Sequence, residues 1–176
     1  MNVGTIDQLI AVCEQMRNAD IIGEYAIGGA FAATLLDEPI ATADVDIFFV
    51  FSKESSSLVL DMTPIYDFAR EQGFAFDHEF IKIHGWLVQF VESGTDPLWL
   101  DAIGSPRLIP VGNTSVPVIE PHFLVLMWLS AGRSKDFEKI ARFVDAGLVT
   151  EEDFSVVERY GLALEWDKVR NRFFPR

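Results

Sequence analysis

The first forty residues place apolar and polar side chains in a pattern that predicts two helices and one short strand. Apolar residues recur at intervals of three and four over residues 6–17, which is the spacing of one helix face, and Thr5 can cap that helix. Residues 24–27 predict a short strand. Residues 30–36 predict a short helix that ends before Pro39, because the residue preceding a proline disfavours helical geometry.

The middle of the chain has the pattern of three strands and one helix. Residues 44–51 are almost continuously apolar after two aspartates, which is typical of a strand covered on both faces. Pro64 is expected to kink the helix or to mark a later start, and His84-Gly85 predicts a hairpin turn. The predicted elements are strands at 44–51, 74–83 and 86–91, a polar loop at 53–57 and a helix at 58–72.

The last third of the chain changes to a purely helical pattern near residue 119. The elements predicted from Asp96 onward are a helix at 97–103, two extended pieces within 108–118, and helices at 120–131, 134–145, 151–159 and 162–173. We therefore expect an α+β fold, in which a small mixed β-sheet with flanking helices precedes a helical C-terminal part. Residues 1–119 would form the α/β core, and residues 120–176 would pack on it within one compact domain.

The composition supports a compact globular protein. The 176 residues suit one domain, and a hydrophobic content of 49% argues against disorder. Aromatic residues of the predicted strands, Phe48 and Phe90 among them, are interpreted as core. Cys13 is the one cysteine and is expected to be buried. Neither a signal peptide nor an apolar run of roughly 18 residues is recognisable, so we expect a cytoplasmic protein without a membrane partner.

The negative charge is unevenly distributed and limits the partners. The formal net charge of −13 argues against non-specific binding to nucleic acid or to anionic membranes. Residues 1–88 hold four basic and fourteen acidic side chains, whereas residues 89–176 hold ten and thirteen. An anionic ligand would therefore need a metal ion at the acidic half and basic side chains from the later half.

Two short motifs carry the candidate chemistry. Gly28-Gly29 closes an apolar strand and opens a short helix, and fourteen residues further on Asp44-Val45-Asp46 opens the next strand. Carboxylates two residues apart on a strand share one face, roughly 6.5–7 Å apart along the backbone, and can converge on a hard cation. Glycines before a helix allow phosphate groups to approach the backbone. Together the motifs predict a metal-assisted nucleotide site.

These motifs resemble those of the nucleotidyltransferase superfamily with the DNA polymerase beta-like fold. The signature of that family is an apolar residue, Gly, then Gly or Ser, a spacer, and two acidic residues separated by one. Residues 81–91 resemble the later strands of its small bacterial members, and residues 117–136, with Ala-Gly-Arg-Ser-Lys-Asp at their end, resemble their C-terminal helical element. The chain is similar to the AbiEii-type toxin group and to related uncharacterised bacterial nucleotidyltransferases over roughly residues 20 to 147.

The resemblance implies roles for particular residues. Asp44 and Asp46 would be the catalytic carboxylates and would hold Mg²⁺, or Mn²⁺, during transfer of a nucleoside monophosphate from a nucleoside triphosphate to an acceptor. The residues expected to contact the nucleotide are Gly28, Gly29, Thr42, Arg133 and Lys135. The acceptor is open, with a protein or a tRNA as candidates.

The chain departs from the family at the third carboxylate. The position that matches it is Gln89, and the alternation of the strand places Glu92 on the opposite face unless a bulge intervenes. Glu79, on the preceding predicted strand, is the other candidate. Ile40 stands where small relatives often carry an arginine. A glutamine cannot accept a proton, so catalysis would lack its usual base.

A second interpretation follows from these departures. The chain would have the nucleotidyltransferase fold but would bind a nucleotide or a partner without turnover, as one component of a toxin–antitoxin pair does. Gln89 and Ile40 favour this interpretation. The Gly-Gly and Asp-x-Asp motifs favour an enzyme, because a scaffold needs neither.

Overall fold

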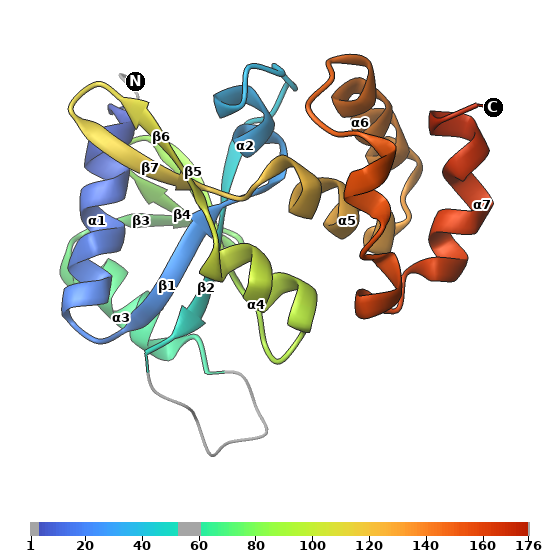
Figure 1. The fold of residues 1–176 in the computed structure, drawn as a ribbon. Helices are drawn as coiled ribbons and strands as arrows, with labels where there is room; N and C mark the ends of the chain where they lie inside the picture. Colours follow the sequence, from blue (N-terminus) through green and yellow to red (C-terminus); the bar gives the residue numbers. More distant parts are fainter. Residues whose placement is uncertain (1–3, 53–60, 176) are drawn as a thin grey trace.

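A seven-stranded mixed sheet forms the centre of the described chain (Figure 1). The computed structural model describes residues 4–52 and 61–175. Across the sheet the strands follow the order β3-β4-β5-β2-β1-β7-β6. Their bounds are β1 Ile22–Ile27, β2 Asp44–Phe51, β3 Ala75–Asp77, β4 Phe80–Ile83, β5 Trp86–Glu92, β6 Arg107–Val111 and β7 Thr114–Val118. The predicted α+β class is confirmed.

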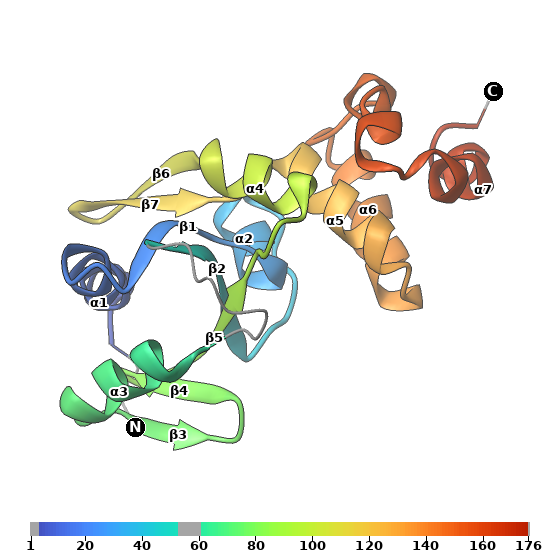
Figure 2. The ribbon, with the colours of Figure 1, turned by 90° about the horizontal axis from the view of Figure 1, so that it is seen from below.

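Helices cover the sheet and form the C-terminal part (Figures 1 and 2). Their bounds are α1 Ile6–Asn18, α2 Gly29–Leu35, α3 Thr63–Glu71, α4 Pro97–Gly104, α5 Pro121–Ala131, α6 Ser134–Asp145 and α7 Ala163–Phe173, with 3₁₀ helices at Glu151–Phe154 and Val157–Tyr160. Among the described helices, none combines the length and apolar character needed to cross a membrane. The proposed division at residue 119 falls between β7 and α5, and its standing as a domain boundary stays a prediction.

Three sequence predictions need correction. The strand expected at 74–83 is interrupted by a turn at His78, whose φ of 56° reverses the chain between β3 and β4. The helix expected at 151–159 consists of two separate 3₁₀ turns. The helix expected from residue 58 begins at Thr63, so Pro64 occupies its first turn as the later start that proline permits. The polar loop expected at 53–57 and residues 58–60 of the expected helix lie outside the described residues.

Strand β2 is central because it pairs on both sides. It runs antiparallel to β1 and parallel to β5. Ile47, Phe48 and Phe49 are all buried, and because successive side chains point to opposite faces, the strand is covered on both faces here, as the continuous apolar run predicts. The two aspartates precede this apolar run, so they occupy the start of the strand where the sheet meets the C-terminal helices.

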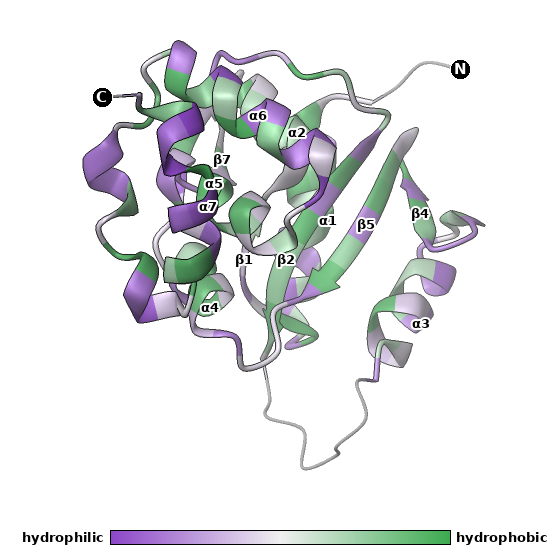
Figure 3. Cartoon of the chain, turned by 90° about the vertical axis from the view of Figure 1, so that its right-hand side faces the viewer, coloured by the Kyte–Doolittle hydropathy of each residue, from purple (hydrophilic) through white to green (hydrophobic). Residues whose placement is uncertain are grey.

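Helix α5 connects the sheet to the helices that follow. Its residues from Phe123 to Leu129 are all buried, because the helix packs against α4 on one side and against α6 and α7 on others. Figure 3 shows this apolar helix beside the more polar α6 and α7. A helix that is apolar all round is expected in such an enclosed position. Arg142 of α6 adds a polar link, since it donates to Glu38 and to the Pro39 carbonyl after α2.

Candidate functional site

Asp44 and Asp46 lie on one face of β2 and are both half-buried. Val45 and Ile47, which alternate with them, are buried. In the parallel pairing with β5, Asp46 lies opposite Gln89. Paired residues project from the same face of a sheet, so two carboxylates and one amide lie together on neighbouring strands.

The glycine pair is shaped by contact with this strand. The N–H of Gly28 donates to the Asp46 carbonyl at 2.9 Å, and a Cβ at Gly28 would lie 2.3 Å from the ring of Phe48. Gly29 has a φ of +63°, and a Cβ there would lie 2.0 Å from Oδ2 of Asp46. Only glycine fits both positions. The second glycine therefore permits the Asp46 carboxylate to lie against the start of α2.

Thr42 lies in the segment that leads into β2. Its hydroxyl donates to the Asp44 side chain and is 3.3 Å from the Asp44 carbonyl. Such a local bond restricts the rotamer of the carboxylate at the start of the strand. The structure thus places Thr42 as a neighbour of Asp44.

A group of cations faces the carboxylates from helix α6. Arg133 is the residue before the first turn, Lys135 is in that turn, and Lys139 is one turn further on. Arg133 and Lys139 both pair with Asp136, whose side chain is fully buried. The ammonium group of Lys139 also lies 5.2 Å from the centre of the Trp128 ring, a cation–π distance.

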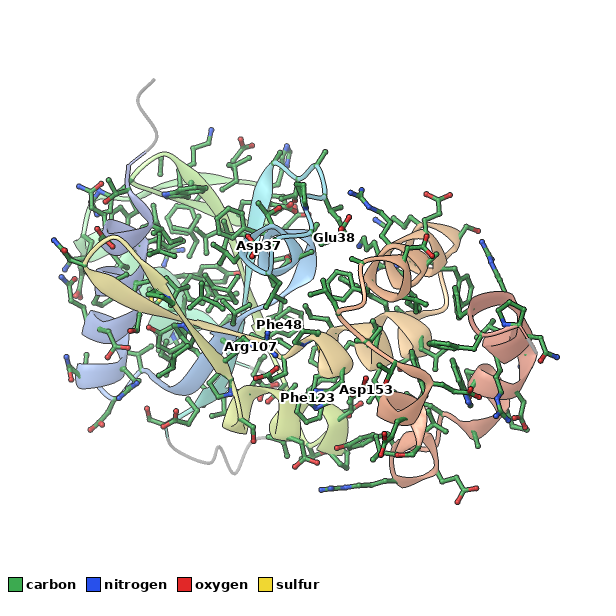
Figure 4. The ribbon with its side chains drawn as sticks, turned by 45° about the horizontal axis from the view of Figure 1, so that its top comes forward. Asp37, Glu38, Phe48, Arg107, Phe123 and Asp153 are labelled. Atoms are coloured by element: carbon green, nitrogen blue, oxygen red, sulfur yellow. The ribbon has the colours of Figure 1, made fainter. Side chains whose placement is uncertain are left out.

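One cavity brings these groups together. It has a volume of about 640 Å³ and lies between the sheet and helices α4, α5 and α6. Figure 4 shows Phe48, one of its lining residues, where the sheet meets the C-terminal helices. Of the residues expected at the site, those that line the cavity are Gly29, Thr42, Asp44, Asp46, Arg133 and Lys135, whereas Gly28 lies behind them against Phe48.

The electrostatics of Asp46 reflect both sides of the cavity. Burial raises the pKa of Asp46, the neighbouring Asp44 raises it further, and Lys139, Arg133 and Lys135 oppose the rise. The α6 cations are therefore near enough to act on this carboxylate. The repulsion between two carboxylates is the condition that a bound divalent cation relieves.

The donors present suit a hard cation only in part. Carboxylate and amide oxygens are ligands that Mg²⁺ accepts, and the ion commonly completes its octahedron with water and phosphate oxygens. Within residues 4–52 and 61–175, no group of three His, Cys, Asp or Glu side chains is placed to hold a metal ion. The set fits a metal ion that arrives with an oxygen-rich ligand better than one bound by protein alone.

The alternative candidates for a third carboxylate lie elsewhere. Glu92 pairs with Phe49 of β2, on the other face of the sheet from Gln89. Glu79 lies in the turn between β3 and β4. Neither lines the cavity. The geometry thus leaves Gln89 beside Asp46, while its correspondence to the family's third carboxylate stays a prediction.

Sequence reasoning left several lining residues out of the site. Lys139 was detectable, because it follows Lys135 by four residues and so lies on the same helix face. Trp99 of α4 and Trp128 of α5 gave no local signal, since apolar residues within helices are usually core. Phe48 was interpreted as core, and it is indeed buried, but it also lines the cavity and lies edge-on to Trp99 with ring centres 5.2 Å apart.

Comparison with known proteins supports the fold. The chain is similar to an antigenic nucleotidyltransferase-like protein from Paracoccidioides brasiliensis, with 13% identity and a TM-score of 0.58 over 94% of this chain and 89% of that one. It is also similar to the antibiotic-resistance factor ANT(2'')-Ia, with 13% identity and a TM-score of 0.53 over 96% of this chain and 90% of that one. No family model and no curated protein matches the sequence. The chain therefore has a nucleotidyltransferase-like fold.

Proposed function

We propose that this protein is a metal-dependent nucleotidyltransferase that transfers a nucleoside monophosphate from a nucleoside triphosphate to an acceptor. The observation that carries the proposal is the cavity in which Asp44, Asp46 and Gln89 face the cations of α6. Carboxylates on one side and cations on the other suit a metal-bound polyphosphate, which needs both.

The residues of the cavity divide the work. Asp44 and Asp46 would hold Mg²⁺ or Mn²⁺, which when bound supplies a Lewis acid for phosphate oxygens. The cations of α6 would bind the phosphate chain and stabilise the negative charge that grows on the leaving pyrophosphate. The apolar wall formed by Phe48 and Trp99 would exclude water and accept a planar ring.

The proton of the acceptor hydroxyl has no clear destination in this cavity. When that oxygen attacks the α-phosphorus, the bond to pyrophosphate breaks and the hydroxyl proton must leave. Gln89 cannot accept it. We therefore propose slow transfer, with the proton passing to water or to a group on the acceptor, which would be a protein or a tRNA.

We further propose a place for the protein among the small bacterial nucleotidyltransferases of the AbiEii-toxin type, acting in the cytoplasm. The support is the element from Ala131 to Asp136, which connects α5 to the first turn of α6 and contributes three residues that line the cavity. Cys13 is consistent with a reducing compartment, because it is buried and burial raises its pKa to about 12.

The alternative is a non-catalytic protein of the same fold that binds a nucleotide or a partner, such as a toxin–antitoxin component. Gln89 favours it, since an amide beside Asp46 adds no charge for a second metal ion. The Asp44–Asp46 pair favours the enzyme, because two close carboxylates in a half-buried site are costly unless a cation joins them.

Calorimetric titration with nucleoside triphosphates tests the proposal directly. We expect ATP or another nucleoside triphosphate to bind in Mg²⁺ and to bind much more weakly in a chelator. Release of pyrophosphate on addition of tRNA or a protein extract would support transfer. Metal-dependent binding without any turnover would favour the alternative. The absence of binding by all four ribonucleoside triphosphates would overturn the enzyme and leave only the form of the alternative that binds a partner.

A further inference from the structure

Asp136 is exceptional among the described residues because it is a charged side chain with no exposed surface. Among the described residues, Ser93 is the one other buried residue with a polar or charged side chain. A buried carboxylate is strongly destabilising unless it is paired and hydrogen-bonded. The position of Asp136, in the first turn of α6 beside the cavity, therefore calls for an explanation.

The carboxylate is satisfied by two cations that line the cavity. Arg133 donates from Nε to Oδ2 and from Nη2 to Oδ1 at 3.2 Å, and Lys139 donates to Oδ1 at 3.1 Å. Burial alone would raise the pKa of Asp136, but the hydrogen bonds from Arg133 and Lys139 outweigh it and lower that pKa. Asp136 is thus held as an anion that accepts hydrogen bonds from both cations.

The paired cations keep donors free for a ligand. An arginine has five N–H donors and a lysine three, and Asp136 takes two of the former and one of the latter. The Arg133 side chain is 57% exposed and that of Lys139 is 17% exposed. Lys139 is further fixed by its position over the Trp128 ring.

Asp136 also competes with Asp46 for the same cations. Both Arg133 and Lys139 act on Asp46 across the cavity. Without the buried carboxylate, these flexible side chains would be free to swing toward Asp44 and Asp46 and to occupy the space between them. Holding them in place beforehand also removes the cost of ordering two long side chains when a ligand binds.

We infer that Asp136 is a positioning residue, whose buried carboxylate holds Arg133 and Lys139 as a fixed pair of cations for the phosphate chain of the nucleotide. The inference rests on the proposed function for the identity of the ligand. It goes further by assigning a role in polyphosphate recognition to a residue that lies outside the cavity lining.

A purely electrostatic role for Asp136 predicts a change in polyphosphate affinity opposite to the change that a positioning role predicts. If Asp136 only neutralised charge near the cavity, its replacement by Asn would make the cavity more positive and would tighten polyphosphate binding. If Asp136 positions the cations, the same change releases them and weakens binding. The direction of the change therefore separates the two.

Calorimetry on the full chain with three probes provides the test. Against ATP with Mg²⁺ and against tripolyphosphate, we expect Asp136→Asn to bind roughly tenfold or more weakly than wild type, as expected for loss of a charge-assisted bond. Adenosine affinity should not change. Glu138→Gln, which removes an exposed negative charge from the same helix, should bind all three probes as wild type does.

Other outcomes overturn the inference. Unchanged or tighter tripolyphosphate binding by Asp136→Asn would do so, as would an equal loss for adenosine and tripolyphosphate, which indicates a general structural defect. A wild type that binds tripolyphosphate but no nucleoside triphosphate would refute the proposed function and leave the inference to be decided by the variant. No tripolyphosphate binding by wild type would refute the inference itself.

A measurement on the wild type covers the case in which Asp136→Asn does not fold. The side-chain N–H signals of Arg133 and Lys139 should be visible by NMR in the free protein, because hydrogen bonding to a buried carboxylate slows exchange with water. Tripolyphosphate should shift both signals without broadening them beyond detection. Signals that exchange too fast to be observed in the free protein would contradict preformed pairs.

Discussion

Two cavities of similar size differ in the parts of the chain that line them and in how their charged side chains are placed. The first, of about 640 Å³, lies between the sheet and helices α4 to α6, and the second, of about 520 Å³, lies in the C-terminal helical part. The second is lined by residues from one stretch of chain between Glu151 and Arg170. Its charged lining residues are four carboxylates, those of Glu151, Glu152, Glu158 and Asp167, and one cation, Arg170. The first is lined by residues from Gly29 to Lys139, and in it the half-buried Asp44 and Asp46 face three cations from the start of α6.

The difference shows that volume is a poor guide to function. In the second cavity Glu151 is neutralised by its own neighbour Arg170, while Phe154 and Trp166 stack with ring centres 4.0 Å apart as packing. In the first cavity Asp44 and Asp46 repel each other, and the nearest cations are engaged with Asp136. Charge held in half-buried positions, rather than space, distinguishes the candidate site, because the four carboxylates of the second cavity are all exposed.

The largest effect that would break this comparison is expected from the paired aspartates. Asp44→Asn with Asp46→Asn should weaken the binding of ATP with Mg²⁺ by roughly 100-fold or more, because both charged metal ligands are lost. Glu152→Gln with Glu158→Gln removes the same charge from the second cavity and should leave ATP binding unchanged. Calorimetry on both double variants measures these affinities. If the two double variants bound ATP with the same affinity, the first cavity would not be distinguished as the nucleotide site.

The next effect concerns the glycine beside Asp46. Gly29→Ala should lose more stability than Gly161→Ala, which serves as its control in the segment that lines the second cavity. Both glycines have positive φ, which costs an alanine about 1–2 kcal/mol. Only at Gly29 does a Cβ also collide with Asp46. Urea unfolding should show the greater loss, and calorimetry should show ATP binding impaired in Gly29→Ala alone. Equal losses of stability in the two variants would mean that the Asp46 side chain moves away from the new Cβ at position 29 at little cost.

A third variant would sharpen the comparison by adding charge to the first cavity. Gln89→Glu should raise Mg²⁺ affinity in the presence of nucleotide by about tenfold, because the substitution would add a third carboxylate beside Asp46. If an acceptor is known, transfer should accelerate. Glu92→Gln, on the other face of the same strand, is the control and should change neither quantity. A response to Glu92→Gln instead would show that the strand register assigns the wrong residue.

The smallest effect is on stability and its dependence on pH, measured without metal. Because the pKa of Asp46 is raised in the folded state, its stabilising contribution is present below the unfolded value of 3.8 and is lost as pH rises through the folded value. As pH rises through the mildly acidic range, the melting temperature of Asp46→Asn should therefore fall less than that of wild type. At neutral pH the variant should melt higher by roughly 2 °C. Parallel curves for the two proteins would contradict the raised pKa.

Much of the fold was predictable because it depends on local patterns. The strand at Asp44–Phe51 matches its prediction to the residue, since a continuous apolar run after two aspartates has few other solutions. The failures are local reversals that apolar periodicity does not record. At His78 a non-glycine residue adopts positive φ, and no turn dipeptide announces it. After Thr150 the helical spacing was present, but the backbone forms two short 3₁₀ turns.

The site divides in the same way. The sequence by itself determined that Asp44 and Asp46 share one face and that Gly28-Gly29 opens a helix, since both follow from local sequence patterns. Only the tertiary structure decided that Gln89 lies opposite Asp46, that Trp99 and Trp128 line the same cavity, and that Asp136 holds the facing cations. Strand pairing and helix packing join residues tens of positions apart, and the free energy of such contacts depends on the whole core rather than on any short segment.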